Sequence, residues 1–376
     1  TMEEKFLLKD YLFNKDRVQK IADEITSVYP SFKKKAFVQD VVEKFPSLEL
    51  TPRIKWISET LRAYLPADYR KATQVLLKSL PPHVDGEKLD NEFGEYIYAP
   101  YSDFVARYGC TQEDLIFSLN ALAEMTKRCS SEDAIRYFIN AFPKETVKQM
   151  LIWSTDQDYH VRRLASEGSR PRLPWSQKIV LSPDVPLPIL NNLFADKSRY
   201  VTRSLSNHMN DISKLDPKLL FATLNTWQKS EKQNPKEMEY IINHSLRTLI
   251  KQGNKDAIRF LNFSIDPEVK VADFALKQDK IYIGDSLEFS FTLSAQKDEQ
   301  LILDYQIHFY NKAGNGHNKK VFKLKKLARK KGESITILKK HPLKQMSTRT
   351  LYPGKYKVEL LINGNNIGEK EFILDQ

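Results

Sequence analysis

One stretch of the sequence, HVRRLASEGSRPRLPW, gathers several cations around a single carboxylate. The carboxylate is Glu167, and the stretch begins at His160 and ends at Trp175. Because a guanidinium group donates paired hydrogen bonds to phosphate oxygens, arginines at this density favour contact with a nucleic-acid backbone. The candidate phosphate-binding side chains of this stretch are His160, Arg162, Arg163, Arg170 and Arg172.

A carboxylate inside an arginine cluster has two physical explanations. Beside nucleic acid, Glu167 would lie in a strongly negative potential, which is costly unless the carboxylate faces a cationic ligand. Alternatively, one or two of the arginines could simply pair with Asp156 and Asp158 at a helix end. Glu167 is therefore a candidate catalytic group, and the structural explanation stays open.

A second candidate carboxylate is Glu132, in the motif SSEDAIRYF. Ser130 or Ser131 predicts a helix N-cap, which places Glu132 and Asp133 in the first helical turn. The helix dipole stabilises acids at that position in any protein. This motif alone therefore favours a structural role over a catalytic one.

A third feature is a concentration of positive charge near the C-terminus. Between Lys312 and Arg349 there are thirteen lysines and arginines and one acid, a net charge of +12, while the whole chain carries +11. The bases alternate with apolar residues, which predicts that they lie along one sheet face and its loops. A solvated surface needs no such bias, so a nucleic-acid platform is favoured. Its candidate contacts are Lys319, Lys320, Lys323 and Lys325.

The sequence has none of the short motifs that bind nucleotides or metals. It contains no glycine-rich phosphate loop, no H-E-x-x-H and no C-x-x-C, and its two cysteines are too few for a zinc site. We therefore expect no metal and no organic cofactor. No apolar run approaches the roughly 20 residues that span a bilayer, and the N-terminus lacks the layout of a signal peptide. These features predict a cytoplasmic protein without a membrane partner.

The elements that must position these residues change in kind near residue 265. Before it, apolar residues recur three and four apart, as in Asp114 to Arg128, which predicts amphipathic helices. From about Val269, short alternating runs punctuated by glycine-containing turns predict seven or eight strands. We expect a multidomain α + β protein, with an α-helical solenoid at residues 1–265 and an immunoglobulin-like β-sandwich at residues 266–376.

An internal repeat supports the solenoid. The segment Trp153 to Gly168 resembles Leu193 to His208 at a spacing of 40 residues, and a weaker third copy covers Glu237 to Gly253. The matched pairs are Asp156 with Asp196, Val161 with Val201, Arg163 with Arg203, and Ser166 with Ser206. A period near 40 is typical of HEAT-like repeats, which stack into a solenoid with a long concave face. The match adds Arg203 to the candidate DNA contacts, although amphipathic helices can resemble one another by chance.

Together these motifs resemble one known family. The run HVRRLASEGSRPRLPW, with W-S-x-D and S-S-E-D-A-I-R before it, strongly resembles the AlkC branch of the AlkC/AlkD superfamily of HEAT-like-repeat alkylpurine DNA glycosylases. The likeness extends through LELTPRIKWISETLRAYLP, YSDFVARYG and HSLRTLIKQGNKDAIRFLNF, and so covers nearly all of the helical region. Some members of this branch add an immunoglobulin-like domain, which fits the segment TRTLYPGKYKVELLING.

The resemblance implies a DNA-3-methyladenine glycosylase, which hydrolyses the N-glycosidic bond of cationic N-alkylated bases in duplex DNA and so starts base excision repair. It implies that Glu132 and Glu167 are the active-site acids, that Trp175 is an aromatic wall, and that Arg163 and Arg170 clamp DNA. The family pattern S-x-E-F-A-I-R-P-F has an apolar residue and a proline where this chain has Asp and Tyr, beside the first acid.

This chemistry suits the residue types. A cationic base leaves as a neutral group without a general acid, while the sugar becomes oxocarbenium-like. A fixed carboxylate can stabilise that cation and orient the attacking water. An indole face adds a cation–π attraction of roughly 0.5–2 kcal/mol.

A function of another class explains the charge and the repeats equally well, namely a non-catalytic HEAT-repeat DNA-binding or scaffold protein. The two hypotheses differ over Glu167, because a scaffold has no use for an acid inside an arginine cluster. For either function the expected partner is duplex DNA, containing alkylated bases in the case of the enzyme. We expect a monomer with no obligate protein partner.

Overall fold

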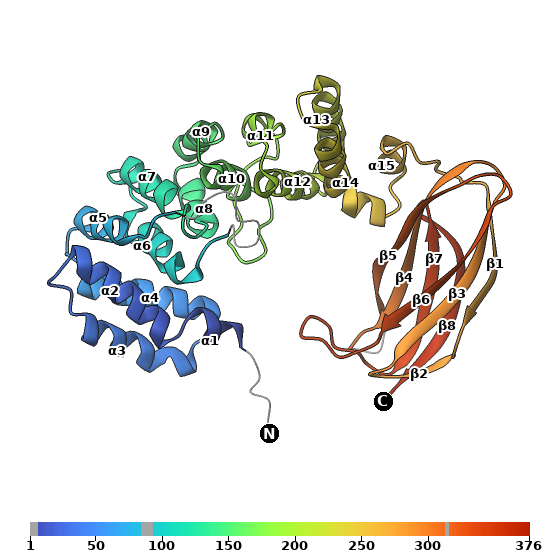
Figure 1. Ribbon diagram of the computed structural model, residues 1–376, viewed down its shortest axis with the longest axis horizontal. Coiled ribbons are helices and arrows are strands. Elements are labelled where there is room, and N and C mark those ends of the chain that lie inside the picture. The colour runs from blue at the N-terminus through green and yellow to red at the C-terminus, as the bar shows by residue number, and fades with distance from the viewer. Residues whose placement is uncertain (1–6, 84–92, 313–315) are drawn as a thin grey trace. The chain divides into compact units, whose positions relative to one another are not determined.

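The structure, a computed structural model, describes residues 7–83, 93–312 and 316–376 (Figure 1). The chain divides into two compact units, Thr1–Ser245 and Leu246–Gln376. This division falls inside the helix Pro235–Lys251, on the N-terminal side of the boundary at residue 265 that the change in sequence pattern indicates.

The first unit is built from helices, and the last of them continues into the second unit. Their apolar residues recur three and four positions apart, as in α2, where Val18, Ile21, Ala22 and Ile25 are buried. Each helix therefore buries one stripe against its neighbours. The helices are α1 (Leu8–Leu12), α2 (Lys15–Val28), α3 (Lys34–Lys44), α4 (Leu50–Tyr64), α5 (Tyr69–Ser79), α6 (Ala99–Gly109), α7 (Leu115–Met125), α8 (Glu132–Ala141), α9 (Pro143–Trp153), α10 (Tyr159–Glu167), α11 (Leu187–Leu193), α12 (Arg199–Ser213), α13 (Pro217–Ser230) and α14 (Pro235–Lys251).

The two stronger copies of the sequence repeat have the same local structure. They lead into α10 and α12, which pack against each other. The backbone N–H of Asp158 donates to Asp156 Oδ1 over 2.8 Å, and that of Ser198 donates to Asp196 Oδ1 over 2.9 Å. Asp158 and Ser198, which precede the two helices, share the same backbone angles of φ −85° and ψ 123°. The conserved spacing therefore reflects a repeated turn that aims both helices the same way.

The second unit contains a β-sandwich, as the alternating runs predict, whose strands pair antiparallel except for β2, which runs parallel to β8. Its inward-facing residues form one core that includes Phe289, Phe291, Tyr305, Tyr356 and Phe372. One sheet has the order β1-β3-β6, formed by β1 (Val269–Leu276), β3 (Ser286–Ala295) and β6 (Ser334–Pro342). The other has the order β2-β8-β7-β4-β5, formed by β2 (Lys280–Tyr282), β8 (Asn365–Asp375), β7 (Gly354–Ile362), β4 (Glu299–Tyr310) and β5 (His317–Arg329).

The end of the helical sequence packs on this sandwich within the same unit. A short helix, α15 (Lys255–Phe260), lies between α14 and β1 in the chain. Just before it, Gly253 approaches Gly364 so closely that an added Cβ would lie 2.8 Å from the Gly364 carbonyl oxygen. The side-chain amide of Asn363 donates to the Ser264 carbonyl over 2.8 Å. Residues near 253 and 264 are thus tied to the β7–β8 turn.

The lysines of β5 do not all lie on one sheet face, so the expectation of a single basic face is wrong. In the register of β4 and β5, Lys320 and Lys325 pair with the core residues Ile307 and Leu303. Lys319 and Lys323 pair with His308 and Asp304, which alternate with the core residues along β4 and so lie on the opposite face. A β-bulge between Leu303 and Asp304 shifts the alternation, because one extra residue of β5 moves every later side chain to the other face.

Among the described residues, no helix has both the length and the apolar character needed to cross a membrane.

Candidate active site

Two carboxylates from neighbouring helices meet on one guanidinium group. Arg163 Nη1 lies 3.3 Å from Glu132 Oε1, and Arg163 Nη2 lies 2.8 Å from Glu167 Oε2. Arg163 and Glu167 are one turn apart on α10, while Glu132 is the first residue of α8. Ser130 Oγ accepts a further hydrogen bond from Arg163 Nη1 over 3.0 Å. The structure therefore joins the two acids that the sequence motifs single out separately.

A third carboxylate, Asp211 of α12, extends this network. Arg170 Nη1 lies 2.7 Å from Glu167 Oε1, and Arg170 Nε lies 3.0 Å from Asp211 Oδ2. Asp211 Oδ2 also accepts from the backbone N–H of Arg172 over 3.3 Å. Both Glu167 and Asp211 are only 3% exposed. Asp211 lies in none of the motifs described above, because its only mark in the sequence is an acid on the buried face of an amphipathic helix.

The carboxylate cluster, defined as Glu132, Glu167 and Asp211 with Arg163 and Arg170, contains more acids than bases. Three carboxylates share two guanidinium groups through the ion pairs described above. With all five groups ionised, these ion-paired groups carry one net negative charge. The buried Arg136, which is not one of the ion-paired groups, also interacts electrostatically with Glu132 and Asp211. A buried site with this balance stabilises an added cation, because no bulk water screens the excess charge.

The two glutamates differ in their affinity for a proton. Burial opposes ionisation of Glu167, but the Arg163 and Arg170 guanidiniums outweigh it and lower the pKa of its carboxyl. At Glu132, burial dominates over its contact with Arg163 and raises the pKa of its carboxyl, with the charge of Glu167 adding to the effect. Glu167 is thus held as a carboxylate, and Glu132 is the more basic of the pair.

Aromatic rings border the carboxylate cluster. The guanidinium carbon of Arg163 lies 4.6 Å from the centroid of the buried Tyr200 ring. Burial raises the pKa of the Tyr96 phenol; the charge of Glu132 adds to this effect and that of Arg163 opposes it. Tyr96 lies outside every motif named above, and Tyr200 lies in the second copy of the repeat, where nothing in the sequence links it to the acids. The proximity of both rings to the acids arises only on folding.

Comparison with known proteins places this geometry in a family. Residues 270–376 match the family model described as the C-terminal Ig-like domain of the uncharacterised protein YhaZ. The Bacillus subtilis (strain 168) protein YhaZ, itself uncharacterized, is 33% identical over 357 residues, which cover 94% of this chain and 95% of the relative. The solved structure of the Pseudomonas fluorescens alkylpurine DNA glycosylase AlkC, bound to DNA containing an abasic site analog, matches with 34% identity and a TM-score of 0.89. That match covers 99% of this chain and 100% of the other. The chain belongs to the AlkC family.

In this AlkC-family chain, Trp175 lies on the surface. Its side chain is 93% exposed, so it is not a core residue. It belongs to the site loop, defined as residues 168–180, which follows α10 and contains neither helix nor strand. The indole has no ring contact or side-chain hydrogen bond with any other described residue, so only the backbone of the site loop sets its position.

The remaining arginines and the histidine of the AlkC-type motif have different surroundings. Arg162 Nε lies 2.7 Å from Asp196 Oδ2, so it links two repeats. His160 is 3% exposed, and burial lowers the pKa of its imidazole to about 4. It is therefore neutral near pH 7 and has no charge to offer a phosphate group. Arg172 and Arg203 are both exposed.

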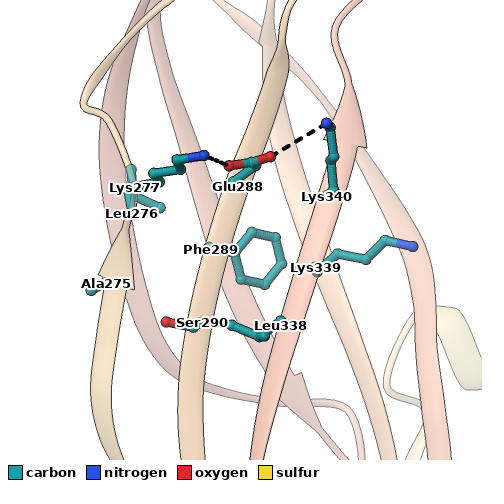
Figure 2. A pocket seen from close by; sticks show the side chains of 9 residues that line it. All are labelled: Ala275, Leu276, Lys277, Glu288, Phe289, Ser290, Leu338, Lys339 and Lys340. Atoms are coloured by element: carbon teal, nitrogen blue, oxygen red, sulfur yellow. Dashed lines mark ion pairs between the residues drawn. The ribbon is translucent and has the colours of Figure 1, made fainter.

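A pocket in the AlkC-family sandwich lies apart from the carboxylate cluster along the chain. It has a volume of about 520 Å³ and lies on the β1-β3-β6 sheet (Figure 2). In Figure 2, Glu288 forms ion pairs with Lys277 over 2.8 Å and with Lys340 over 3.4 Å. These charges largely satisfy one another, and the exposed Leu338 lines the same pocket. We assign the chemistry to the carboxylate cluster, because there two neighbouring buried acids have opposed pKa shifts.

In the part of the chain that the structure describes, no three His, Cys, Asp or Glu side chains gather closely enough to hold a metal ion.

Proposed function

We propose that this AlkC-family chain is a DNA-3-methyladenine glycosylase that hydrolyses the N-glycosidic bond of cationic N-alkylated bases in duplex DNA and so starts base excision repair. The observation that carries the proposal is the net negative charge of the buried carboxylate cluster, which suits a positively charged nucleotide. Support comes from the similarity, over nearly the whole chain, to an alkylpurine DNA glycosylase bound to DNA.

The opposed pKa shifts suggest separate roles for the two glutamates. Glu167, whose pKa is lowered, supplies a fixed negative charge that stabilises the oxocarbenium-like sugar. Glu132, whose pKa is raised, accepts a proton from the attacking water. The departing base needs no proton, because N-alkylation already makes it a neutral leaving group. Trp175, whose indole is exposed, packs on the lesion or its sugar.

The basic residues contact the DNA backbone in this proposal. Arg172 and Arg203 are the exposed arginines of the helical unit's motifs, while Arg163 and Arg170 act through the glutamates that they hold. In the sandwich, the lysines of β5 supply positive charge along an edge strand. Such contacts give affinity without sequence preference.

The direct test is formation of abasic sites in a methylated plasmid, measured as alkali-sensitive nicks. We expect the purified protein to create abasic sites in methylated plasmid, which alkali then converts to nicks. Unmethylated plasmid treated in the same way should remain intact. A matched duplex with a single 3-methyladenine should release the free base. If the protein binds both plasmids but produces no abasic sites, the non-catalytic DNA-binding protein becomes the better description.

A further inference from the structure

Arg136 is a fully buried arginine whose hydrogen bonds go to the site loop. It lies on α8, one turn after Glu132, and is 0% exposed. Its Nε donates to the Gln177 carbonyl over 2.8 Å. Its Nη1 donates to the Gly168 carbonyl over 3.1 Å and to the Arg170 carbonyl over 2.8 Å. One guanidinium thus holds both ends of the segment that carries Trp175.

Burying a guanidinium without a carboxylate partner destabilises the folded protein, because the charge loses its hydration. Among the described residues, no Asp or Glu oxygen lies within ion-pair distance of Arg136. Burial lowers the pKa of Arg136, which is the sign of an incompletely compensated charge. Backbone carbonyls are weaker partners for a cation than carboxylates are. An apolar side chain would fill this position at lower cost, so a requirement other than packing explains the arginine.

The site loop depends on α8 more than on its own structure. Residues 168–180 form no helix or strand, so ladder hydrogen bonds do not fix their backbone. Asn140, one turn beyond Arg136, donates to the Lys178 carbonyl over 2.9 Å and accepts from the Val180 N–H over 3.3 Å. An added Cβ on Gly168 would lie 2.4 Å from the Ile135 Cγ2 atom, so the loop starts in direct contact with α8.

The same helix therefore carries one acid of the carboxylate cluster and the anchor of the loop. Glu132, Arg136 and Asn140 follow one another at intervals of four residues, which places them along one side of α8. Glu132 reaches Arg163, while Arg136 and Asn140 reach the loop. The position of Trp175 relative to the acids is consequently set by α8.

We propose that Arg136 is a positioning residue for the glycosylase reaction, whose guanidinium fixes the site loop so that Arg170 keeps its place beside Glu167 and the loop holds Trp175 in a fixed position. The part of this proposal that concerns excision rests on the proposed function. Arg136 does not touch the reacting atoms; it acts through the backbone of the loop. A misplacement of about 1 Å in such a group lowers a reaction rate by roughly 100-fold.

The test compares Arg136→Met with Arg53→Met, a matched control. Arg53 is also buried and also donates to backbone carbonyls, those of Phe13, Phe45 and Leu48, but in the N-terminal helices. Unlike Arg136, it also forms an ion pair, over 2.8 Å with the exposed Asp10. Both variants lose a buried guanidinium, so both should melt at a lower temperature. We expect only Arg136→Met to speed amide hydrogen exchange in residues 168–180 of the free protein. It should also lower single-turnover excision per folded molecule by about 10- to 100-fold.

Two further variants sharpen the outcome. Arg136→Lys keeps the charge but cannot span three carbonyls, so it should fold and still show fast exchange in the loop. Arg136→Met should lower the excision rate by a smaller factor in a Trp175→Ala background than in the wild type. In that background the loop no longer has an indole to position. Unchanged loop exchange in both Arg136 variants would overturn the proposal, as would an equal excision defect in Arg53→Met. If wild-type protein excises nothing, the glycosylase proposal fails, while the exchange data still decide whether Arg136 anchors the loop.

Discussion

At the residue scale, the carboxylate cluster derives its chemistry from unequal numbers of acids and bases. Arg163 is shared between Glu132 and Glu167, and Arg170 is shared between Glu167 and Asp211. Glu167 therefore has two cationic partners and Glu132 has one. This difference explains why the pKa of one glutamate falls and that of the other rises although both are buried.

The raised pKa of Glu132 has a consequence for the pH dependence of excision. Only its ionised form can accept a proton from water, so the single-turnover rate should rise with pH through this raised pKa, above the ordinary 4.5. Glu167 stays ionised over that range because its pKa is lowered. The single-turnover rate of Glu132→Gln should therefore be low and should no longer rise with pH in the acidic range. An acid limb that survives in Glu132→Gln would assign the proton transfer to another group.

Part of this site could be predicted from sequence and part could not. Glu132 and Glu167 lie in compositionally unusual motifs, so both could be named in advance. Asp211 could not, because it meets Arg170 from 41 residues away and lies in an ordinary amphipathic helix. Burial of His160 was missed for a similar reason: its cationic neighbours in sequence suggest a surface, but the ring packs between Tyr159 and Tyr200.

At the element scale, helices fix the acids and an irregular loop carries the aromatic side chain. The repeat at a spacing of 40 residues could be recognised from sequence, because the turns before α10 and α12 use the same acid-to-backbone hydrogen bond. The face of each β5 lysine could not, because the β-bulge beside Asp304 shifts the alternation by one residue. A bulge leaves no clear mark in an alternating run.

For the loop, we expect Trp175→Ala to lower excision more than it lowers stability. Truncation of a core tryptophan lowers the free energy of unfolding by about 3–5 kcal/mol. This indole is 93% exposed, so its removal should lower that free energy far less. The melting temperature should therefore move little, while single-turnover excision of 3-methyladenine falls. A large drop in melting temperature with full activity per folded molecule would show that Trp175 stabilises the fold and does no more.

At the scale of the whole molecule, positive charge is concentrated in the C-terminal unit, whereas the carboxylate cluster belongs to the helical unit. The segment Lys312 to Arg349 has a net charge of +12, about that of the entire chain. The immunoglobulin-like domain was recognisable from its alternating runs and turns. The packing of residues near Gly253 and Ser264 on the sandwich was not, because it depends on contacts with the β7–β8 turn.

The two faces of β5 should differ in their effect on DNA binding. Lys323 lies opposite the buried Asp304, whose charge offsets it, while Lys320 shares a positive potential with Arg349 and Lys251. Reversing Lys320 and Lys325 to Glu should therefore weaken binding more than reversing Lys319 and Lys323. Each lost phosphate contact lowers the log–log salt slope by about 0.9.

Titrations of an alkylated duplex at several salt concentrations measure these slopes. We expect the log–log salt slope to fall by about 2 when Lys320 and Lys325 are reversed, and by less when Lys319 and Lys323 are reversed. Slopes equal to wild type in both variants would mean that β5 makes no phosphate contact.

In the proposed mechanism, the negative charge of Glu167 stabilises the cation formed as the glycosidic bond breaks. Single-turnover excision of 3-methyladenine by Glu167→Gln tests it directly, with Glu145→Gln, an exposed helical acid, as control. The substitution keeps the volume and removes the charge, so excision should fall by about 10²–10³-fold while DNA binding is kept or slightly strengthened. The control should match wild type in both measurements. Wild-type excision by folded Glu167→Gln would show that this charge does not stabilise the transition state.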